Sequence, residues 1–242
     1  MKYISVFLLL VASVLGEWQG CIQENQEDNK VTKGKQTPVC LNVAIDAGNW
    51  ADQTSFRTYS FTPEADDYSR FIIAGSFKSL VQENAGTAQN ITAFGSSQQS
   101  VSFLRMYYQK NVGVFPYLTA VIDVKDGIVQ GIAWDKACIF CSNDKCAENT
   151  YGFDGEPAFP MEPTKGCFIP AEECIAEGSV NNGETENPCD LKLHVVWTGT
   201  DANGKYLTSS SKRFSAFNPK QVRDQLKDAF DKLKDSVNVR KK

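Results

Sequence analysis

An even set of eight cysteines constrains this chain more than any other feature of its sequence. Residues 1–16 precede them and carry one early positive charge, at Lys2, followed by an apolar run, which is the pattern of a cleaved secretory signal peptide. Thiols pair in the oxidising compartment that such a leader predicts, and an even number leaves none over. We therefore predict a secreted, extracellular protein with every cysteine in a disulfide: Cys21, Cys40, Cys138, Cys141, Cys146, Cys167, Cys174 and Cys189.

Six of these cysteines fall within residues 138–189, a segment rich in glycine, proline, glutamate and asparagine. Its prolines include Pro157, Pro160, Pro163 and Pro170. Prolines this close together prevent regular strand ladders, so disulfides must order the segment. The sequence predicts a disulfide-rich irregular insertion here. It does not predict the pairing, because eight cysteines allow 105 pairings.

Two other uses of sulfur fit this spacing less well. Cys138 and Cys141 are separated by two residues, a spacing that can place two thiolates on one zinc ion. The spacings to Cys146 and Cys167 are long and unequal, and the predicted compartment favours disulfides. A redox-active Cys-x-x-Cys pair needs a strand-to-helix junction in a parallel sheet, and no such pattern surrounds Cys138. We predict neither a metal site nor a redox site.

Short runs of Val, Ile, Phe, Tyr and Thr alternate with Gly, Asn, Asp and Ser clusters between residues 38 and 134. Such runs indicate strands separated by turns. The predicted strands are residues 39–45, 55–61, 70–77, 91–94, 101–108 and 117–124.

Two dipeptides predict hairpin turns. Asp126-Gly127 joins the apolar runs 120–124 and 128–134, and Asn203-Gly204 lies between the runs 191–197 and 206–217. Both dipeptides tolerate the positive φ angles of a tight turn. We expect one antiparallel strand pair around each.

His194 is the only histidine of the chain, so any Ser-His-Asp or Cys-His catalyst must use it. Alternation along the run 191–197 puts four apolar residues on one face and places Lys192 and His194 on the other, polar face. A histidine in the middle of a strand is ordinarily exposed or paired across strands. The chain also lacks a Gly-x-Ser-x-Gly elbow. We therefore predict no catalytic residue and no cofactor.

The two ends of the chain differ from the strand-rich middle. Residues 17–37 are mostly polar, which predicts a flexible segment tethered by Cys21. Near the other end, Asn218 is suited to cap a helix, with Pro219 in its first turn. An amphipathic helix over residues 218–237 is predicted by an apolar stripe at helical spacing: Val222, Leu226, Ala229, Phe230, Leu233 and Val237.

These patterns together predict a mainly β fold, an antiparallel β-sandwich with a disulfide-rich irregular insertion and a carboxyl-terminal α-helix. The domain boundaries follow from the same signals. A signal peptide covers residues 1–16 and a flexible segment residues 17–37. The β-rich domain covers residues 38–217, with the insertion at 138–189, and the helix covers residues 218–237.

Charge and hydropathy exclude two classes of partner. The chain has 25 Lys and Arg against 29 Asp and Glu, so it has no basic excess to bind nucleic acid. The longest later apolar stretch, residues 112–124, is interrupted by polar residues and falls short of the roughly 20 residues of a membrane-spanning helix. We predict no nucleic-acid binding and no membrane span.

Paired acids could serve glycoside hydrolysis, which needs only two carboxyl groups roughly 5 to 10 Å apart. Candidates by proximity are Asp66 with Asp67, Glu172 with Glu173, and Asp123 with Asp126, although acids in solvated turns are the more ordinary interpretation. The run from Asp201 to Gly204 imitates the start of a calcium loop, but no carboxylate follows it, which favours a β-turn.

The sequon Asn90-Ile91-Thr92 predicts a glycan on Asn90 in a eukaryotic host, because the surrounding residues indicate a surface loop.

By elimination, the sequence predicts a non-enzymatic extracellular protein that acts in recognition or assembly, with an extracellular protein or glycan as partner. Loops on a rigid scaffold would carry the contact surface, above all residues 138–189. Strand aromatics such as Tyr117 could add a binding platform, although each is also an ordinary core residue. Two alternatives stay open: a secreted carbohydrate-active hydrolase with paired carboxylates, and a protease inhibitor that presents residues 159–170.

Overall fold

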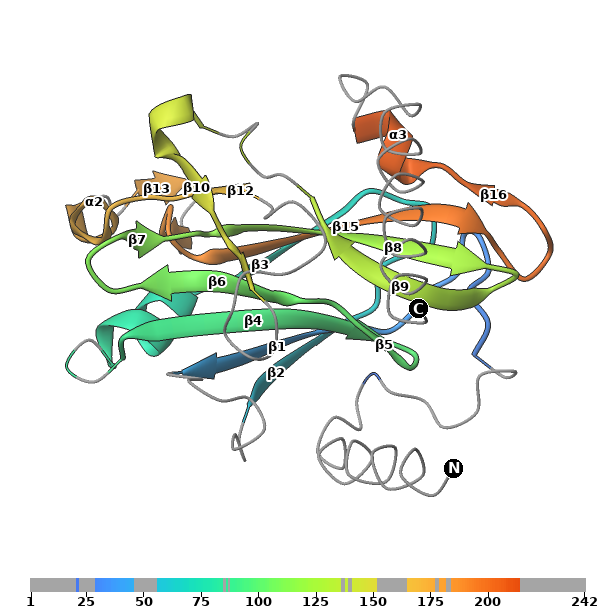
Figure 1. Ribbon diagram of the computed structural model, residues 1–242, viewed down its shortest axis with the longest axis horizontal. Coiled ribbons are helices and arrows are strands. Elements are labelled where there is room, and N and C mark those ends of the chain that lie inside the picture. The colour runs from blue at the N-terminus through green and yellow to red at the C-terminus, as the bar shows by residue number, and fades with distance from the viewer. Residues whose placement is uncertain are drawn as a thin grey trace, which may run out of the picture.

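A computed structural model describes residues 21, 29–45, 56–84, 86, 88–135, 138, 141–151, 165–176, 179–181 and 184–213. Within these residues the chain is mainly β and forms two large sheets that lie as two layers (Figure 1). The predicted signal peptide and the predicted helix over residues 218–237 lie outside the described residues. No helix of the described part is both long enough and apolar enough to cross a membrane.

The first sheet has the strand order β11-β6-β4-β1-β2, with β5 on β4 and β7 on β6, and all its pairings are antiparallel. Its strands are β1 (Val39–Ile45), β2 (Arg57–Phe61), β4 (Asn90–Ser97), β5 (Ser100–Val101), β6 (Leu104–Gln109), β7 (Gly113–Val114) and β11 (Thr150–Tyr151). The predicted strand over residues 101–108 is divided in two. Its break is at Ser102, whose hydroxyl accepts the Gly95 amide at 2.9 Å.

The second sheet has the order β16-β15-β8-β9, with β3 also paired to β15. Its strands are β3 (Ser69–Ile73), β8 (Tyr117–Lys125), β9 (Ile128–Trp134), β15 (Leu191–Thr200) and β16 (Tyr206–Leu207). The pair β8 and β15 is parallel, from Lys192 opposite Tyr117 to Gly199 opposite Val124, and every other pair of this sheet is antiparallel. The predicted antiparallel sandwich is therefore confirmed in architecture, with one parallel pair inside it.

One hydrophobic core fills the space between the layers. Alternation in β15 places its apolar face in this core, as predicted, and the fully buried residues there are Leu191, Leu193, Val195 and Trp197. The opposite face of β15 is buried too, since Lys192 is 3% and His194 4% exposed. The sequence predicted a polar face for these two residues. The Tyr117 ring and the carbonyls of Pro188 and Asp190 contact Lys192, and Tyr68 contacts His194, which explains their burial.

Both predicted hairpins form, with one difference in length. Asp126 and Gly127 have φ angles of 52° and 82°, and they connect β8 to β9. After Asn203-Gly204, however, the returning strand β16 has only two residues, and α3 (Ser209–Arg213) replaces the strand predicted there. The strand stops because the Asp66 carboxylate accepts the backbone amides of Thr208 and Ser209, which caps α3 instead of continuing the ladder.

A second predicted strand also ends early. Residues 70–77 begin as β3, but Gly75 has a φ of 73° and a π-helix follows at Phe77–Gln82. The cause is distant in sequence, since the Asp190 carboxylate accepts the amides of Gly75 and Phe77, each at 3.0 Å. A buried carboxylate that binds two amides turns the chain away from the sheet.

In its described residues the disulfide-rich insertion contains short elements. They are a 3₁₀ turn (Asn143–Lys145), β10 (Cys146–Glu148), β11, β12 (Lys165–Cys167), α2 (Ala171–Ala176), β13 (Ser179–Asn181) and β14 (Glu184–Glu186). Strand β11 joins the first sheet, and two small antiparallel sheets form, β10 with β12 and β13 with β14. All eight cysteines pair as Cys21–Cys40, Cys138–Cys146, Cys141–Cys167 and Cys174–Cys189. Disulfides of this number indicate a protein that folds outside the reducing cytosol.

Residues 29–37, the last part of the segment predicted to be flexible, lie against the second sheet. The Val31 amide donates to Gly127 O at 2.8 Å, and Val31 O accepts the Ala202 amide at 2.9 Å. The Gln98 side chain donates to Asn29 O at 2.9 Å. The two Val31 backbone bonds join the segment to both hairpin turns of that sheet.

Gly199 gives a sharp test of the parallel pair. Its φ is +96°, and a Cβ there would lie 1.8 Å from Val124 O, a backbone atom that cannot move aside. Gly199→Ala should therefore lower the free energy of unfolding by at least about 3 kcal/mol, through backbone strain and steric overlap. Gly131→Ala is the matched control, because nothing lies within 4 Å of its added Cβ. Equal urea unfolding midpoints for the two variants would contradict the pairing.

Candidate functional site

A recess of about 360 Å³ lies between the insertion and the start of the second sheet. Its volume is within the range of small-ligand sites, roughly 300 to 1,000 Å³. Its walls combine an aromatic and aliphatic part with a few polar groups, and the lining residues are Tyr117, Cys141, Ser142, Lys145, Cys167, Phe168, Ile169, Glu173 and Pro188.

Disulfides fix the walls of this recess. Cys141–Cys167 forms part of the lining itself, and Cys138–Cys146 joins the segment before it to β10. Cys174–Cys189 connects α2, which carries Glu173, to the residue after Pro188. Three segments that are far apart in the sequence are thus covalently joined around one hollow, and this restricts their relative motion.

Backbone contacts attach the same walls to the sheets. Ile169 and Val114 exchange two backbone hydrogen bonds of 2.8 Å, which joins one wall to β7. The Phe168 ring lies 6.0 Å from the Phe115 ring, between centroids. At the opening, Lys145 Nζ bonds both carboxylate oxygens of Glu173, at 3.1 and 3.0 Å. The pair is exposed, so a charged or polar ligand can compete for it at small cost.

A buried cation lies behind the aromatic wall. Lys192 Nζ is 5.6 Å from the centroid of the Tyr117 ring, and it donates to the carbonyls of Pro188 at 2.9 Å and Asp190 at 3.0 Å. These carbonyls and the ring satisfy an ammonium group that is otherwise costly to bury. Lys192 therefore fixes both Tyr117 and Pro188, two of the residues that line the recess.

Arg105 of β6 supports the strand that carries Cys167. Its guanidinium is fully buried and donates to Lys165 O at 3.1 Å. Burial lowers the pKa of Arg105 to about 9, and the nearby Asp135 charge opposes that shift. Gly166 lets β12 approach, since a Cβ there would lie 2.4 Å from Asn149 Nδ2 and 3.1 Å from Arg105 Nη2. The residue next to Cys167 must therefore be small.

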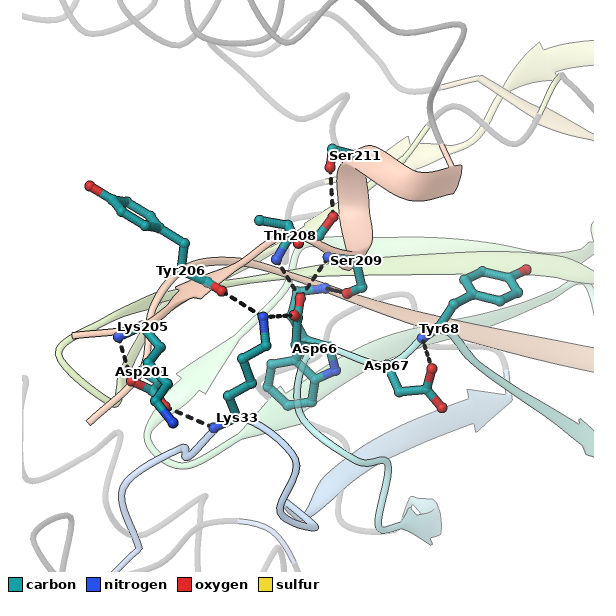
Figure 2. A network of polar contacts seen from close by, with 11 residues as sticks. Lys33, Asp66, Asp67, Tyr68, Asp201, Lys205, Tyr206, Thr208, Ser209 and Ser211 are labelled. Atoms are coloured by element: carbon teal, nitrogen blue, oxygen red, sulfur yellow. Dashed lines mark hydrogen bonds and ion pairs between the residues drawn. The ribbon is translucent and has the colours of Figure 1, made fainter. Parts of the chain in front are cut away.

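A polar network at the opposite end of β15 organises the second hairpin turn (Figure 2). The buried Asp201 carboxylate accepts the backbone amides of Lys33 at 3.0 Å, Asn203 at 2.8 Å and Lys205 at 2.7 Å. Lys33 Nζ pairs with Asp66 and donates to Tyr206 O at 3.1 Å. The turn is therefore held at both of its ends, and a carboxylate already bound to amides does not resemble a calcium ligand.

Tyr206 projects from this network. Its side chain is 74% exposed, the largest value among the exposed large hydrophobic residues of the described part, where the others lie between 36% and 38%. Figure 2 shows the ring pointing away from Lys33 and Asp66. The next residue, Leu207, is buried at 3% exposure. The backbone of Tyr206 is thus fixed on both sides while its ring lies in solvent.

His194 lies away from the recess lining, and it is buried rather than exposed. Its Nδ1 hydrogen-bonds the Tyr68 hydroxyl, which belongs to the residue before β3. Of the two states expected for His194, exposed or paired across strands, the contact corresponds to the second, since β3 pairs with β15.

Acids that the sequence singled out have separate structural contacts. Asp66 binds Lys33 and two amides, whereas Asp67 accepts the Tyr68 amide at 2.9 Å. Glu173 pairs with Lys145, and Asp126 accepts a bond from Thr200 Oγ1 at 3.5 Å. In the part of the chain that the structure describes, no group of three or more His, Cys, Asp or Glu side chains could hold a metal ion.

The inhibitor segment, residues 159–170, is described only from residue 165 onward. There β12 pairs with β10, and Ile169 pairs with Val114, so the described half belongs to ladders and to the recess wall. Asn90 is exposed at the first position of β4, and Thr92 two residues later is buried.

The recess lies beside the segment that the sequence analysis expected to carry the contact surface, but most of its lining residues were not singled out there. Lys145, Phe168 and Pro188 carry no motif, and Glu173 was considered only as a partner of Glu172. Only the disulfide pairing brings them together, and the pairing was the quantity that the cysteine count left open.

A family model described as Uncharacterised protein DDB_G0273449 matches residues 104–221, just under half of the chain. This range runs from the start of β6 to beyond α3, so it contains every residue that lines the recess and also Tyr206. The family description names no activity. No curated protein and no solved structure matches the chain.

Acid titration tests the hairpin network. Burial raises the pKa of Asp66 and Asp201, but hydrogen bonds from Lys33 and from backbone amides outweigh it, and both pKa values lie below the ordinary 3.8. Each ionised carboxylate stabilises the fold fully at a pH above its pKa in the unfolded chain. This stabilisation is lost as the pH falls to the lower pKa that the group has in the folded protein. Asp66→Asn combined with Asp201→Asn should flatten the loss of stability below about pH 4 and lower stability at pH 7.

Urea unfolding at pH 7, 4 and 3 measures this effect. Glu83→Gln is the control, since it removes one exposed carboxylate away from the network. An acid dependence in the double variant as steep as that of the wild type would contradict the role of these two carboxylates.

Proposed function

We propose that this is a secreted, non-enzymatic protein that recognises an extracellular glycan or protein through the recess beside its disulfide-rich insertion. The observation that carries the proposal is the recess itself, about 360 Å³ in volume, with walls joined by disulfides. Its compartment is inferred from those disulfides and from the leader pattern of residues 1–16.

Rigid walls favour binding because less conformational freedom is lost when a ligand enters. The chemistry of the lining supports a ligand with both an apolar surface and polar groups. Tyr117, Phe168, Ile169 and Pro188 offer the apolar surface, while Ser142 and the Lys145–Glu173 pair offer hydrogen bonds at the opening. A sugar ring or a short peptide segment meets both requirements.

A binding role is favoured over the hydrolase because a hydrolase needs two acids free to act on one bond. Glu173 is the one acid among the residues lining the recess, and it pairs with Lys145. Asp66, Asp67 and Asp126 contact backbone amides, a lysine or a hydroxyl elsewhere in the described structure, and Glu172 is exposed on α2 outside the lining.

Filling the recess tests the proposal. Ser142 lies exposed in the lining, so Ser142→Trp should occupy the hollow without disturbing the core. We expect binding to an array of extracellular glycans and displayed peptides to fall at least about tenfold, because bulk in a small pocket excludes the ligand. Gln130→Trp, at an exposed position of β9, should leave binding unchanged.

Two outcomes would contradict this assignment. One is equal array binding by the wild type and Ser142→Trp, which would place recognition elsewhere. The other is release of reducing sugar from an array glycan by the wild type but not by Glu173→Gln, which would identify a hydrolase.

We also propose that Asn90 carries an N-linked glycan when the chain is secreted from a eukaryotic cell. The sequon Asn90-Ile91-Thr92 and the exposure of Asn90 support it. Treatment with an N-glycosidase should lower the mass of the secreted wild type by one glycan and leave Asn90→Gln unchanged. An unchanged wild-type mass would refute the modification.

A further inference from the structure

The hairpin end and the recess lie at opposite ends of the same pair of strands. Tyr117 and Lys192 mark the recess end, and Val124 and Gly199 mark the hairpin end, seven residues further along β15. At about 3.3 Å per residue the two ends are roughly 23 Å apart. In Figure 1 the insertion with α2 lies at one side of the molecule and the β16 turn at the other. The ring of Tyr206 therefore cannot reach the recess of its own chain.

The two ends present surfaces of opposite form. One presents Tyr206, a protruding ring with a fixed backbone, and the other is a hollow lined by Tyr117, Phe168, Ile169 and Pro188. Tyrosine is among the residues that most often dominate the energy of protein interfaces, because it offers a large apolar area at little entropic cost. The recess of its own chain is out of reach of the Tyr206 ring, whereas the recess of a second copy is accessible to it.

Charge at the two ends supports the same contact. Lys205, next to Tyr206, is exposed, and α2 at the recess carries the exposed acids Glu172 and Glu173. The nearby Lys33 is paired with Asp66, and Glu173 with Lys145, which leaves Lys205 and Glu172 as the opposite charges best placed to meet. Opposite charges at the edge of an interface favour its formation and set its orientation.

We propose that Tyr206 of one copy of this chain enters the recess of a second copy, so that the protein self-associates head to tail. This inference rests on the proposed recess and names its occupant. Because the two surfaces differ, the contact is heterologous, and each added copy leaves one free Tyr206 and one free recess. A contact centred on one ring buries far less than the roughly 1,200 Å² of a stable interface. Association should therefore be weak, with a Kd on the order of 100 μM.

Sedimentation equilibrium of the purified disulfide-bonded protein tests the proposal. The wild type should form a concentration-dependent series of dimers and longer chains, and Tyr206→Ser and Ser142→Trp should each raise the Kd at least about tenfold. Val112→Ser, which removes another exposed apolar side chain, is the matched control and should associate as the wild type does.

Mixing the two weakened variants gives the decisive measurement. Tyr206→Ser keeps an intact recess and Ser142→Trp keeps an intact Tyr206, so an equimolar mixture should form a dimer that cannot extend. Lys205→Glu should weaken wild-type association, and Glu172→Lys in the same chain should restore it.

Several results would overturn the head-to-tail contact: a wild type that stays monomeric up to about ten times the expected Kd, association unaffected by Tyr206→Ser, or no dimer in the mixture. The proposed function is judged separately, by array binding at dilute protein. If self-association fails but Ser142→Trp still loses array binding, the recess keeps its role and only its occupant changes.

Discussion

The parallel pairing of β8 with β15 is the constraint on which the rest of the structure depends. It joins the hairpin before the insertion to the strand after it, so the long excursion from Trp134 to Leu191 leaves and rejoins the sheet at the same end, on opposite sides of β8. Parallel strands need a crossover connection. Here β9 brings the chain back along β8, and the disulfide-linked segment completes the connection to β15 in place of a single helix. This segment lies beside Tyr117 and forms the recess with it. The close approach of Gly199 to Val124 fixes the other end of the pair.

Buried carboxylates decide where the strands of this sheet stop. Asp190, Asp66 and Asp201 each accept two or more backbone amides, and each ends a ladder or closes a turn. Such amides would otherwise be buried without partners, which costs about 1 to 3 kcal/mol for each group. Two of these carboxylates lie next to the recess and to the hairpin turn that carries Tyr206. Asp190 lies two residues from Lys192 behind the recess wall, and Asp201 holds the turn from which Tyr206 projects.

The proposed recognition role rests on the rigidity of two surfaces, the recess and the hairpin end. The recess is open to solvent, a disulfide forms part of its lining, and a buried lysine and a buried arginine support its walls from behind. The polar groups of its lining include one exposed ion pair. The hairpin end is equally ordered but presents a ring instead of a hollow. We propose that the recess binds a ligand and that Tyr206 of one copy can enter the recess of another. Both proposals rest on surfaces whose geometry is fixed before binding.

The sequence by itself determined the features that depend on local pattern. A run of strand-favouring residues predicted the strand Val39–Ile45, and alternation predicted the inward face of β15. Asp126-Gly127 predicted the first hairpin, and the even cysteine count predicted complete pairing. Tertiary structure alone decided which cysteines pair, that β15 runs parallel to β8, and that Lys192 and His194 are buried. It also ended two predicted strands through Asp190 and Asp66. The parallel pairing and the two strand ends depend on contacts between residues more than 70 positions apart, and the disulfides join residues 8 to 26 positions apart. The pattern of neighbouring residues does not specify either kind of contact.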